Sequence, residues 1–198
     1  MGWNFGGAVI DFDFHSVVDT LLEPERRQYL TGAETPEEAR SKAQIDAGAV
    51  ALDALDLSAD PADAPITFAD ATSRDFDDYA VGMVDRKTVI LGRGLGLHQD
   101  SPGLRSACER VSRERGAVFA FWFNDASDTY VFSVFRDGAR VRFRSSGPGL
   151  HDDEGARVPG EPEETSEGHD HQMAMLVAVT GRPFIDLLEL QLERFYAC

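Results

Sequence analysis

The dipeptide Asp137-Gly138 lies between two runs in which apolar and polar side chains alternate, and no other feature constrains the fold as strongly. Asp-Gly is typical of a two-residue hairpin turn, because both positions tolerate positive φ. The turn sets the register of the two strands. Phe132 is therefore expected opposite Phe143 on one face, and Ser133 opposite Arg142 on the other. We predict a hairpin with one core face and one face that carries arginines.

The segment Val118–Phe123 comes just before this hairpin and is apolar throughout. An unbroken apolar run is typical of a central strand that is covered on both faces. The polar residues Asn124–Asp128 make a turn of suitable length between this strand and the hairpin. Residues 117–146 are therefore predicted to be a three-stranded antiparallel meander at the centre of the fold.

Three further segments have strand character. Tyr79–Val84 and Thr88–Leu91 are predicted to form a second hairpin. Trp3–Asp13 has a strand pattern interrupted by Gly6-Gly7, which indicates a bulge or a close backbone approach, and we expect it to be an added strand. Met173–Val179 fits a buried helix or a buried strand.

Helices are indicated by capping residues and apolar spacing. Thr35-Pro36-Glu37-Glu38 combines an N-cap, a proline at the first helical position and a capping box. Ser101-Pro102 begins a helix that is predicted to reach Arg115. Apolar spacing predicts a helix within His15–Leu30 and a last amphipathic helix from Pro183. The apolar face of this last helix would consist of Phe184, Leu187, Leu188, Leu192 and Phe195.

These elements predict an α+β fold, in which an antiparallel β-meander sheet is flanked by helices. A chain of 198 residues with 42% hydrophobic composition can bury a core without disulfides, so we predict a single domain over residues 1–198. The acidic, turn-rich segment Ser58–Pro65 is where an N-terminal helical subdomain of residues 1–60 would end.

The two cysteines, Cys108 and Cys198, do not make a disulfide framework. Cys108 shares an apolar helix face with Leu104 and Val111, which favours a packed thiol over a reactive one. The sequence shows neither an apolar leader nor a long apolar run, so we expect a cytoplasmic protein without membrane contact. No cofactor is expected.

Negative charge is the strongest signal in the composition. The chain has 35 acidic and 19 basic residues, a net charge of −16, which argues against a nucleic-acid or anionic-membrane surface. The acids concentrate in residues 53–85 and 152–170, and such segments are either solvated loops or contacts for a basic partner. The residues proposed to bind a protein partner are Asp75, Asp77, Asp78, Glu161, Glu163 and Glu164.

Histidines and carboxylates also gather in residues 151–154 and 169–171. A divalent metal site would need three or four of these side chains to converge, and the loop between them is long enough to allow it. The alternative function is then a small metal-dependent hydrolase or metal-binding enzyme. Its ligands would be His151, Asp152, His169 and His171. If residues 169–171 instead form the first turn of a helix, the negative charge of Asp170 would only stabilise the positive end of the helix dipole.

Arg140, Arg142 and Arg144 alternate along the second strand of the hairpin and are expected on one face. Such a stripe could bind phosphate or a partner carboxylate, but with so many acids in the chain we favour internal ion pairs. Ser145-Ser146 and Cys108 lack the sequence context of an activated nucleophile. No catalytic residue is predicted, and the sequence favours a binding protein over an enzyme.

Three features of the C-terminal half support a family resemblance. They are the strand pair TYVFSVFRDGARVRF, the loop with Gly155 and Glu161-Pro-Glu-Glu164, and the Thr180-Gly181 step before the last amphipathic segment. Through them, residues 117–198 resemble small acidic bacterial proteins of the toxin-immunity type and related uncharacterised families. The resemblance implies a non-catalytic inhibitor that binds one cognate toxin, often a basic enzyme. Acidic loops on a rigid scaffold would steer association with such a basic domain.

A third alternative is a homodimeric interaction module of unknown role. Trp3 or the aromatic residues of Phe119–Phe123 would then lie at the interface between two copies. The sequence leaves the oligomeric state and the identity of any partner open.

Overall fold

The computed structural model describes residues 3–14, 36–73, 75–92, 94–95, 101–163 and 168–198. The strands in these ranges are β1 (Asn4–Ile10), β2 (Ala59–Pro61), β3 (Ile66–Thr67), β4 (Tyr79–Val84), β5 (Lys87–Leu91), β6 (Val118–Asn124), β7 (Thr129–Arg136), β8 (Ala139–Ser146), β9 (Asp153–Glu154) and β10 (Gln191–Ala197). The helices are α3 (Pro36–Ala54), α4 (Phe68–Ala71), α6 (Pro102–Glu114), α7 (Gly168–Thr180) and α8 (Phe184–Leu187).

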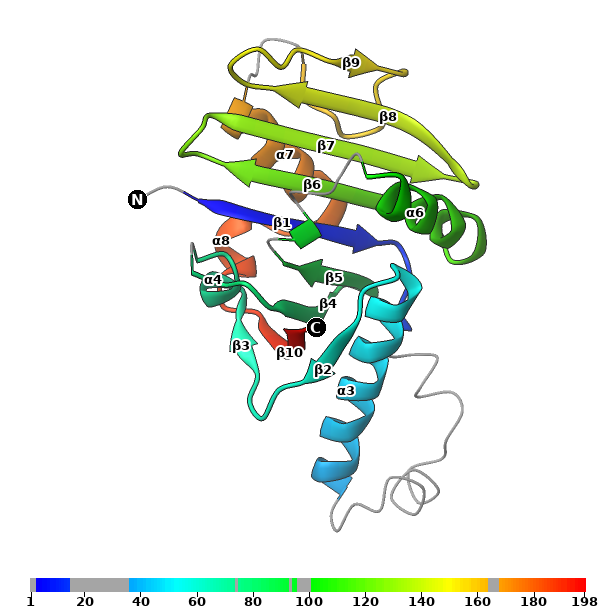
Figure 1. The fold of residues 1–198 in the computed structure, drawn as a ribbon, viewed down its shortest axis with the longest axis vertical. Helices are drawn as coiled ribbons and strands as arrows, with labels where there is room; N and C mark the ends of the chain where they lie inside the picture. Colours follow the sequence, from blue (N-terminus) through cyan, green and yellow to red (C-terminus); the bar gives the residue numbers. More distant parts are fainter. Residues whose placement is uncertain (1–2, 15–35, 74, 93, 96–100, 164–167) are drawn as a thin grey trace.

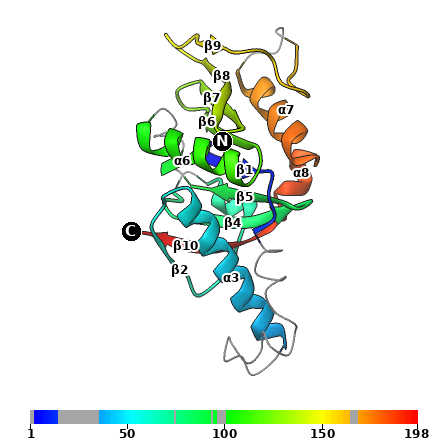
Figure 2. The same ribbon diagram turned by 90° about the vertical axis from the view of Figure 1, so that its right-hand side faces the viewer.

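Within the described ranges, ten strands form one antiparallel sheet. Their order is β2-β10-β4-β5-β1-β6-β7-β8-β9, and β3 pairs with β10 beside this path. Helices α3 and α6 lie on one face, and α7 and α8 lie on the other (Figure 1, Figure 2). The predicted α+β fold, an antiparallel sheet flanked by helices, is confirmed.

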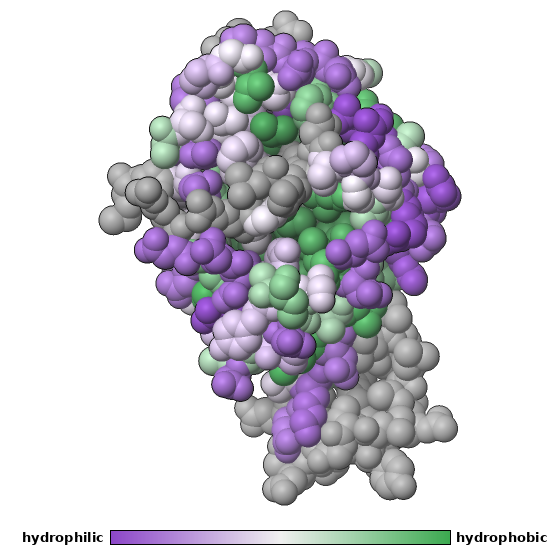
Figure 3. Space-filling model, viewed as in Figure 1, coloured by the Kyte–Doolittle hydropathy of each residue, from purple (hydrophilic) through white to green (hydrophobic). Residues whose placement is uncertain are grey.

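Each face of the sheet has its own hydrophobic core. The core under α7 includes Phe121, Phe132 and Met175, and the core under α3 and α6 includes Ile10 and Leu52. Figure 3 shows the face that carries α3 and α6, with hydrophilic residues along its sides and hydrophobic ones near the centre of the view. Strands in the middle of the sheet are therefore covered on both sides.

The predicted meander is present as β6, β7 and β8. Its hairpin turn has φ values of 52° at Asp137 and 82° at Gly138, as the Asp-Gly dipeptide predicts. β6 contributes side chains to both cores, which explains its unbroken apolar sequence. The prediction of three consecutive antiparallel strands is confirmed.

The register within the hairpin differs from the prediction because β8 contains a β-bulge. Phe135 pairs with Arg140, as predicted. Val134 then pairs with Arg142, which leaves Val141 as an extra residue. A one-residue bulge reverses the facing of every residue that follows it in the strand.

The predicted pairs Phe132–Phe143 and Ser133–Arg142 are therefore wrong. Phe143 lies opposite Ser133, and Arg144 lies opposite Phe132. The turn type determines only the first pairs, and a valine in a strand gives no sign that it will be bulged. As a result, Arg142 and Arg144 share a face with Phe132.

The predicted strand is confirmed as β1, which lies in the middle of the sheet and pairs with both β5 and β6. The predicted close backbone approach is confirmed at Gly7. A Cβ atom there would lie 2.6 Å from the carbonyl oxygen of Ile90 and 2.7 Å from the ring of Phe121. Glycine is required because any side chain would collide with the neighbouring strands.

The second hairpin is also confirmed as β4 and β5. α6 begins at Pro102, and the hydroxyl of its N-cap, Ser101, accepts a hydrogen bond from the N–H of Leu104. This helix buries Cys108 completely. Burial raises the pKa of the Cys108 thiol to about 12, which favours the protonated form and agrees with the predicted packed thiol.

α3 begins at Pro36, as the capping box predicts, and continues through Gly48. A Cβ atom at Gly48 would lie 2.5 Å from the ring of Phe195, so the small residue lets the helix approach β10 closely. β2 follows and joins the same sheet. The helix predicted within His15–Leu30 lies outside the described residues.

The C-terminal segment contains one helix that the sequence left open and one strand that it missed. Met173–Val179 belongs to helix α7. The predicted last helix is wrong, because only α8 is helical and β10 pairs with β2 and β4. Leu192 packs into one core and Phe195 into the other. Their spacing of three also fits one face of a helix, so the sequence pattern does not distinguish the two structures.

Candidate functional site

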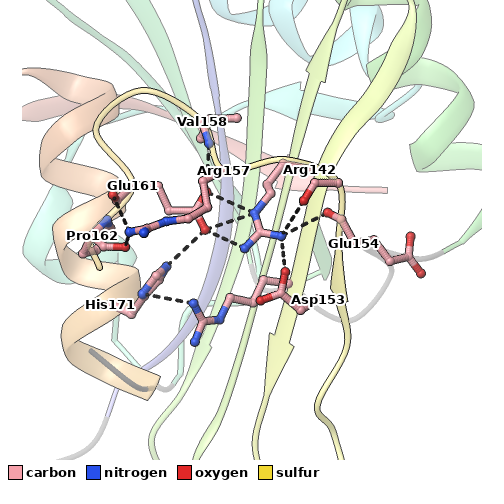
Figure 4. A network of polar contacts seen from close by, with 10 residues as sticks. Arg142, Asp153, Glu154, Arg157, Val158, Glu161, Pro162 and His171 are labelled. Carbon is pink, nitrogen blue, oxygen red and sulfur yellow. Dashed lines mark hydrogen bonds and ion pairs between the residues drawn. The ribbon is translucent and has the colours of Figure 1, made fainter. Parts of the chain in front are cut away.

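A buried arginine organises the loop that leads from β8 to α7. The side chain of Arg142 is 2% exposed, and that of Glu161 is fully buried beside it. Arg142 Nε donates to the Glu161 carboxylate at 3.0 Å, and Nη2 donates to Oε1 at 2.6 Å. Nη1 donates to Asp153 and to the carbonyl oxygens of Glu154 and Gly155, at 3.1 and 3.2 Å. Figure 4 shows this arginine cluster.

The loop is closed by further hydrogen bonds to its own backbone. The N–H of Val158 donates to Glu161 Oε2 at 3.0 Å, and Arg157 donates to the carbonyl oxygens of Glu161 and Pro162 (Figure 4). The buried pair of Arg142 and Glu161 therefore fastens the β8–α7 loop to the sheet, and the exposed Arg157 closes the loop on itself. A buried guanidinium whose donors are occupied holds its partners in one geometry.

The pKa values of the cluster reflect this pairing. Burial alone would raise the pKa of Glu161, but hydrogen bonds from Arg142 and the Val158 N–H outweigh it and lower the pKa. The pKa of Asp153 is lowered, chiefly by its hydrogen bond from Arg142. Burial would lower the pKa of Arg142, and the two carboxylates raise it instead. The fold therefore favours the charged form of all three groups.

Beside the arginine cluster lies an open groove with a volume of about 720 Å³. Its lining comes from the end of β8, the start of the loop, the β6–β7 turn and the first turn of α7. The ionisable residues in this lining are Asp128, Arg144, His151, Asp152, Asp153, His169 and Asp170. Four carboxylates and one guanidinium line the groove, and such an excess of acidic groups favours cations over anions.

All four carboxylate residues are exposed, and two of them are also held by hydrogen bonds. Asp152 accepts a hydrogen bond from Ser145 Oγ at 2.8 Å, and its N–H donates back to that oxygen at 3.1 Å. Asp153 is held by Arg142. Asp128 and Asp170 are exposed, on the β6–β7 turn and in the first turn of α7. The groove thus has an ordered wall and an accessible acidic rim.

His169 is oriented by a carboxylate of the β6–β7 turn. Its Nδ1 lies 3.1 Å from Asp125 Oδ1, and Asp125 also accepts from the N–H of Trp3 at 2.9 Å and from the hydroxyl of Tyr130 at 3.0 Å. Burial would raise the pKa of Asp125, but these hydrogen bonds lower it. The contacts fix one end of α7 to the sheet.

The four predicted metal ligands do not converge. His151, Asp152 and His169 line the groove, whereas His171 is buried under the arginine cluster. His171 stacks on Phe132 with ring centroids 5.9 Å apart. Among the described residues, no group of three or more histidine, cysteine or acidic side chains is placed to hold a metal ion. His169 and His171 begin helix α7, as the alternative interpretation expected.

The predicted partner-binding residues fall into different environments. Glu161 is buried on Arg142, so its assignment to a binding surface is corrected: this carboxylate is internal. Asp78 pairs with Arg194 at 2.5 Å. Three of the six predicted residues are exposed at the surface, namely Asp75, Asp77 and Glu163. Glu164 lies outside the described residues.

The predicted arginine stripe is also corrected. Arg140 keeps its predicted facing and lies 4.4 Å from the centre of the Phe143 ring, but the bulge turns Arg142 and Arg144 to the opposite face, toward α7. Arg140 pairs with Glu154 at 3.0 Å. The expectation of internal ion pairs is confirmed for Arg140 and Arg142.

Of the aromatic residues proposed for a dimer interface, the three phenylalanines belong to the core, and Trp3 and Trp122 are partly buried. Phe119, Phe121 and Phe123 are at most 2% exposed. Trp3 packs on Phe184, with ring centroids 4.6 Å apart. These side chains are therefore occupied within the chain.

No family model, curated protein or solved structure matches this chain. Sequence reasoning found the acids of residues 152–170 but missed Asp125 and Asp128, which lie in the polar turn predicted between β6 and β7. Within the described ranges, none of the helices combines the length and apolar character that crossing a membrane requires.

Proposed function

We propose that this protein is a non-catalytic acidic binding protein, and that it acts in the cytoplasm as an immunity protein that neutralises a bacterial toxin. The observation that carries the proposal is the acidic groove of about 720 Å³ beside the arginine cluster. A lysine or arginine side chain of a basic toxin domain would enter it and meet the carboxylates of Asp128 and Asp170. The family resemblance of residues 117–198 points to the same class of partner.

Preorganisation supports this function. The arginine cluster already holds Asp153, and Ser145 already holds Asp152, so binding would not have to order this wall of the groove. Pre-ordered groups reduce the entropic cost of association. The net charge of −16 would accelerate encounter with a basic partner, and salt would weaken this effect.

The decisive experiment first captures the partner of this protein and then tests whether this protein rescues the growth of cells that express that partner. Tagged protein is incubated at low salt with lysate of its native host, and a stoichiometric basic partner is identified by mass spectrometry after a salt step. That partner, expressed alone, should arrest growth, and co-expression of this protein should restore it. A captured partner that does not arrest growth, or growth that co-expression fails to restore, would contradict toxin neutralisation.

The groove is tested with a matched pair of variants. Asp128→Asn with Asp170→Asn removes two charges from the groove rim, and Asn tolerates the positive φ of residue 128, which is 50°. Asp63→Asn with Glu189→Gln removes two exposed charges elsewhere, at residues that were not proposed to bind a partner. We expect the groove pair to weaken partner binding by about tenfold and the control pair to change it little. Equal effects would remove the groove from the proposal.

A further inference from the structure

A second, smaller cavity lies near the other end of α7, between this helix and the sheet. Its volume is about 160 Å³. The deep wall is apolar and consists of Val9, Phe119, Val134 and Met175, each at most 4% exposed. Val158 and Pro159 of the β8–α7 loop form another side. Ten of the thirteen lining residues are apolar, so the interior is mainly an apolar space.

The mouth of the cavity is charged. Lys87, at the start of β5, is half-buried, and Arg136, at the end of β7, is exposed. The Lys87 ammonium donates to the carbonyl oxygen of Val179 at 2.5 Å, which holds it at the C-terminal end of α7. Asp11 is the one acid among the residues that line this cavity, so the rim carries two cations and one anion. This positive rim is a local exception on a strongly acidic chain.

We propose that this cavity binds a small apolar monocarboxylate of about the size of benzoate. Apolar cavities of about 150 Å³ accommodate a benzene ring. The ring would lie against Val134 and Met175, and the carboxylate would lie at the mouth between Lys87 and Arg136. An ammonium group has three donors, so the contact with Val179 leaves capacity for a carboxylate, and a guanidinium binds carboxylates through paired donors.

This site is independent of the proposed neutralising function. The acidic groove is formed at the first turn of α7, whereas the cavity is formed near its last turn. The two sites also differ in sign, because the groove favours cations and the cavity mouth favours an anion. One proposal can therefore fail while the other holds.

The test is a titration of the full chain with three probes that share a ring and differ in charge. Benzoate is anionic, benzyl alcohol is neutral and benzylamine is cationic, and the carbon-13 methyl resonances of Met175 and of the valines report on the cavity. We expect benzoate to shift the resonances of Met175 and Val134 and to bind at least about tenfold more tightly than benzyl alcohol. Benzylamine should bind more weakly still. Equal affinity for the three probes, shifts confined to distant methyl groups, or no binding would overturn the proposal.

Variants of the rim separate the charge from the cavity. Lys87→Met keeps the length of the side chain and should weaken benzoate binding about tenfold without changing that of benzyl alcohol. Arg136→Gln alters an exposed residue, so folding is preserved, and benzoate should bind about threefold more weakly. Arg105→Gln removes the same charge on α6, across the sheet, and should have no effect. Unchanged benzoate affinity in the Arg136 variant, or in a folded Lys87 variant, would overturn the proposed carboxylate contacts.

Discussion

At the scale of single residues, Arg142 and Glu161 give the β8–α7 loop its position. Both side chains are almost inaccessible to water, and the loop residues Asp153, Glu154 and Gly155 all contact the guanidinium. Taking two charges out of water is costly, so such a pair adds little net stability compared with an apolar pair of similar shape. Its value here is positional, because it holds one wall of the acidic groove.

Removing one member of the pair should therefore be costly. Glu161→Gln would leave Arg142 buried with a single carboxylate partner, and we expect the free energy of unfolding to fall by about 3 kcal/mol. Glu163→Gln is the matched control, since this residue is exposed, and should change stability by less than about 0.5 kcal/mol. Urea unfolding of both variants gives the comparison. A loss in the Glu161 variant no larger than in the control would mean that the pair is not a structural contact.

The same pair predicts a pH dependence. The pKa of Glu161 is lower in the folded chain than its usual value of 4.5, so the fold favours the ionised form. The stabilisation is complete above about pH 4.5 and is lost as the pH falls through the lowered pKa. The difference in unfolding free energy between the wild type and Glu161→Gln should thus be constant at neutral pH and shrink in acid. A difference that stays constant down to about pH 3 would contradict this assignment.

At the scale of elements, the bulge in β8 and the loop that covers it depend on each other. Gly155 has φ of 83°, and a Cβ atom there would lie 2.1 Å from the carbonyl oxygen of Val141, the bulged residue. The arginine cluster fastens the loop at this point. The bulge therefore sets both the facing of Arg142 and the site where the loop is anchored.

Two glycines of this loop provide a matched pair of substitutions. Gly149 has φ of 76°, and no atom lies within 4 Å of where a Cβ would be. Gly149→Ala should therefore lower the free energy of unfolding only through the strained backbone conformation, by about 1 kcal/mol. Gly155→Ala adds the collision with Val141, and we expect a total cost of about 3 kcal/mol. Thermal unfolding of the two variants is sufficient to compare them. Equal losses would show that the loop can move away from the bulge at no cost.

Helices and strands could be predicted where a short sequence motif, such as a turn dipeptide or a helix cap, determines the local structure. The Asp-Gly turn located β7 and β8, and the capping residues located the starts of α3 and α6. β10 was not predicted, because apolar and polar residues do not alternate in a strand that is covered on both faces. The spacing of Leu192 and Phe195 also fits a helix. The candidate site was only partly predictable. Glu161 pairs with Arg142 because of a β-bulge, and no residue type in the sequence indicates where that bulge lies.

At the scale of the whole molecule, the order of strands in the sheet departs strongly from their order in the chain. β10 lies between β2 and β4, and β1 lies between β5 and β6. Segments from both halves of the sequence are therefore needed to complete the middle of the sheet. Sequence periodicity describes each strand by itself and contains no information on its neighbours.

Deleting residues 191–198 should consequently disrupt the sheet and not only shorten the chain. The deletion removes the buried side chains of Leu192 and Phe195 and exposes the edge of β4. We expect a loss of cooperative unfolding and concentration-dependent aggregation, since burial of each side chain contributes about 2 kcal/mol and an open edge invites pairing. Removing Cys198 alone should leave the unfolding transition cooperative. A cooperative transition in the longer deletion would contradict the interior position of β10.

The central position of β1 also has a consequence for synthesis of the protein. Residues 4–10 are translated long before β6, with which they pair at residues 118–124. At about 5–20 residues per second, the ribosome needs on the order of ten seconds to make the intervening chain. During that interval the segment NFGGAVI has no β6 to cover it. Chaperones that bind short apolar segments would be suited to cover this nascent strand until β6 has been made.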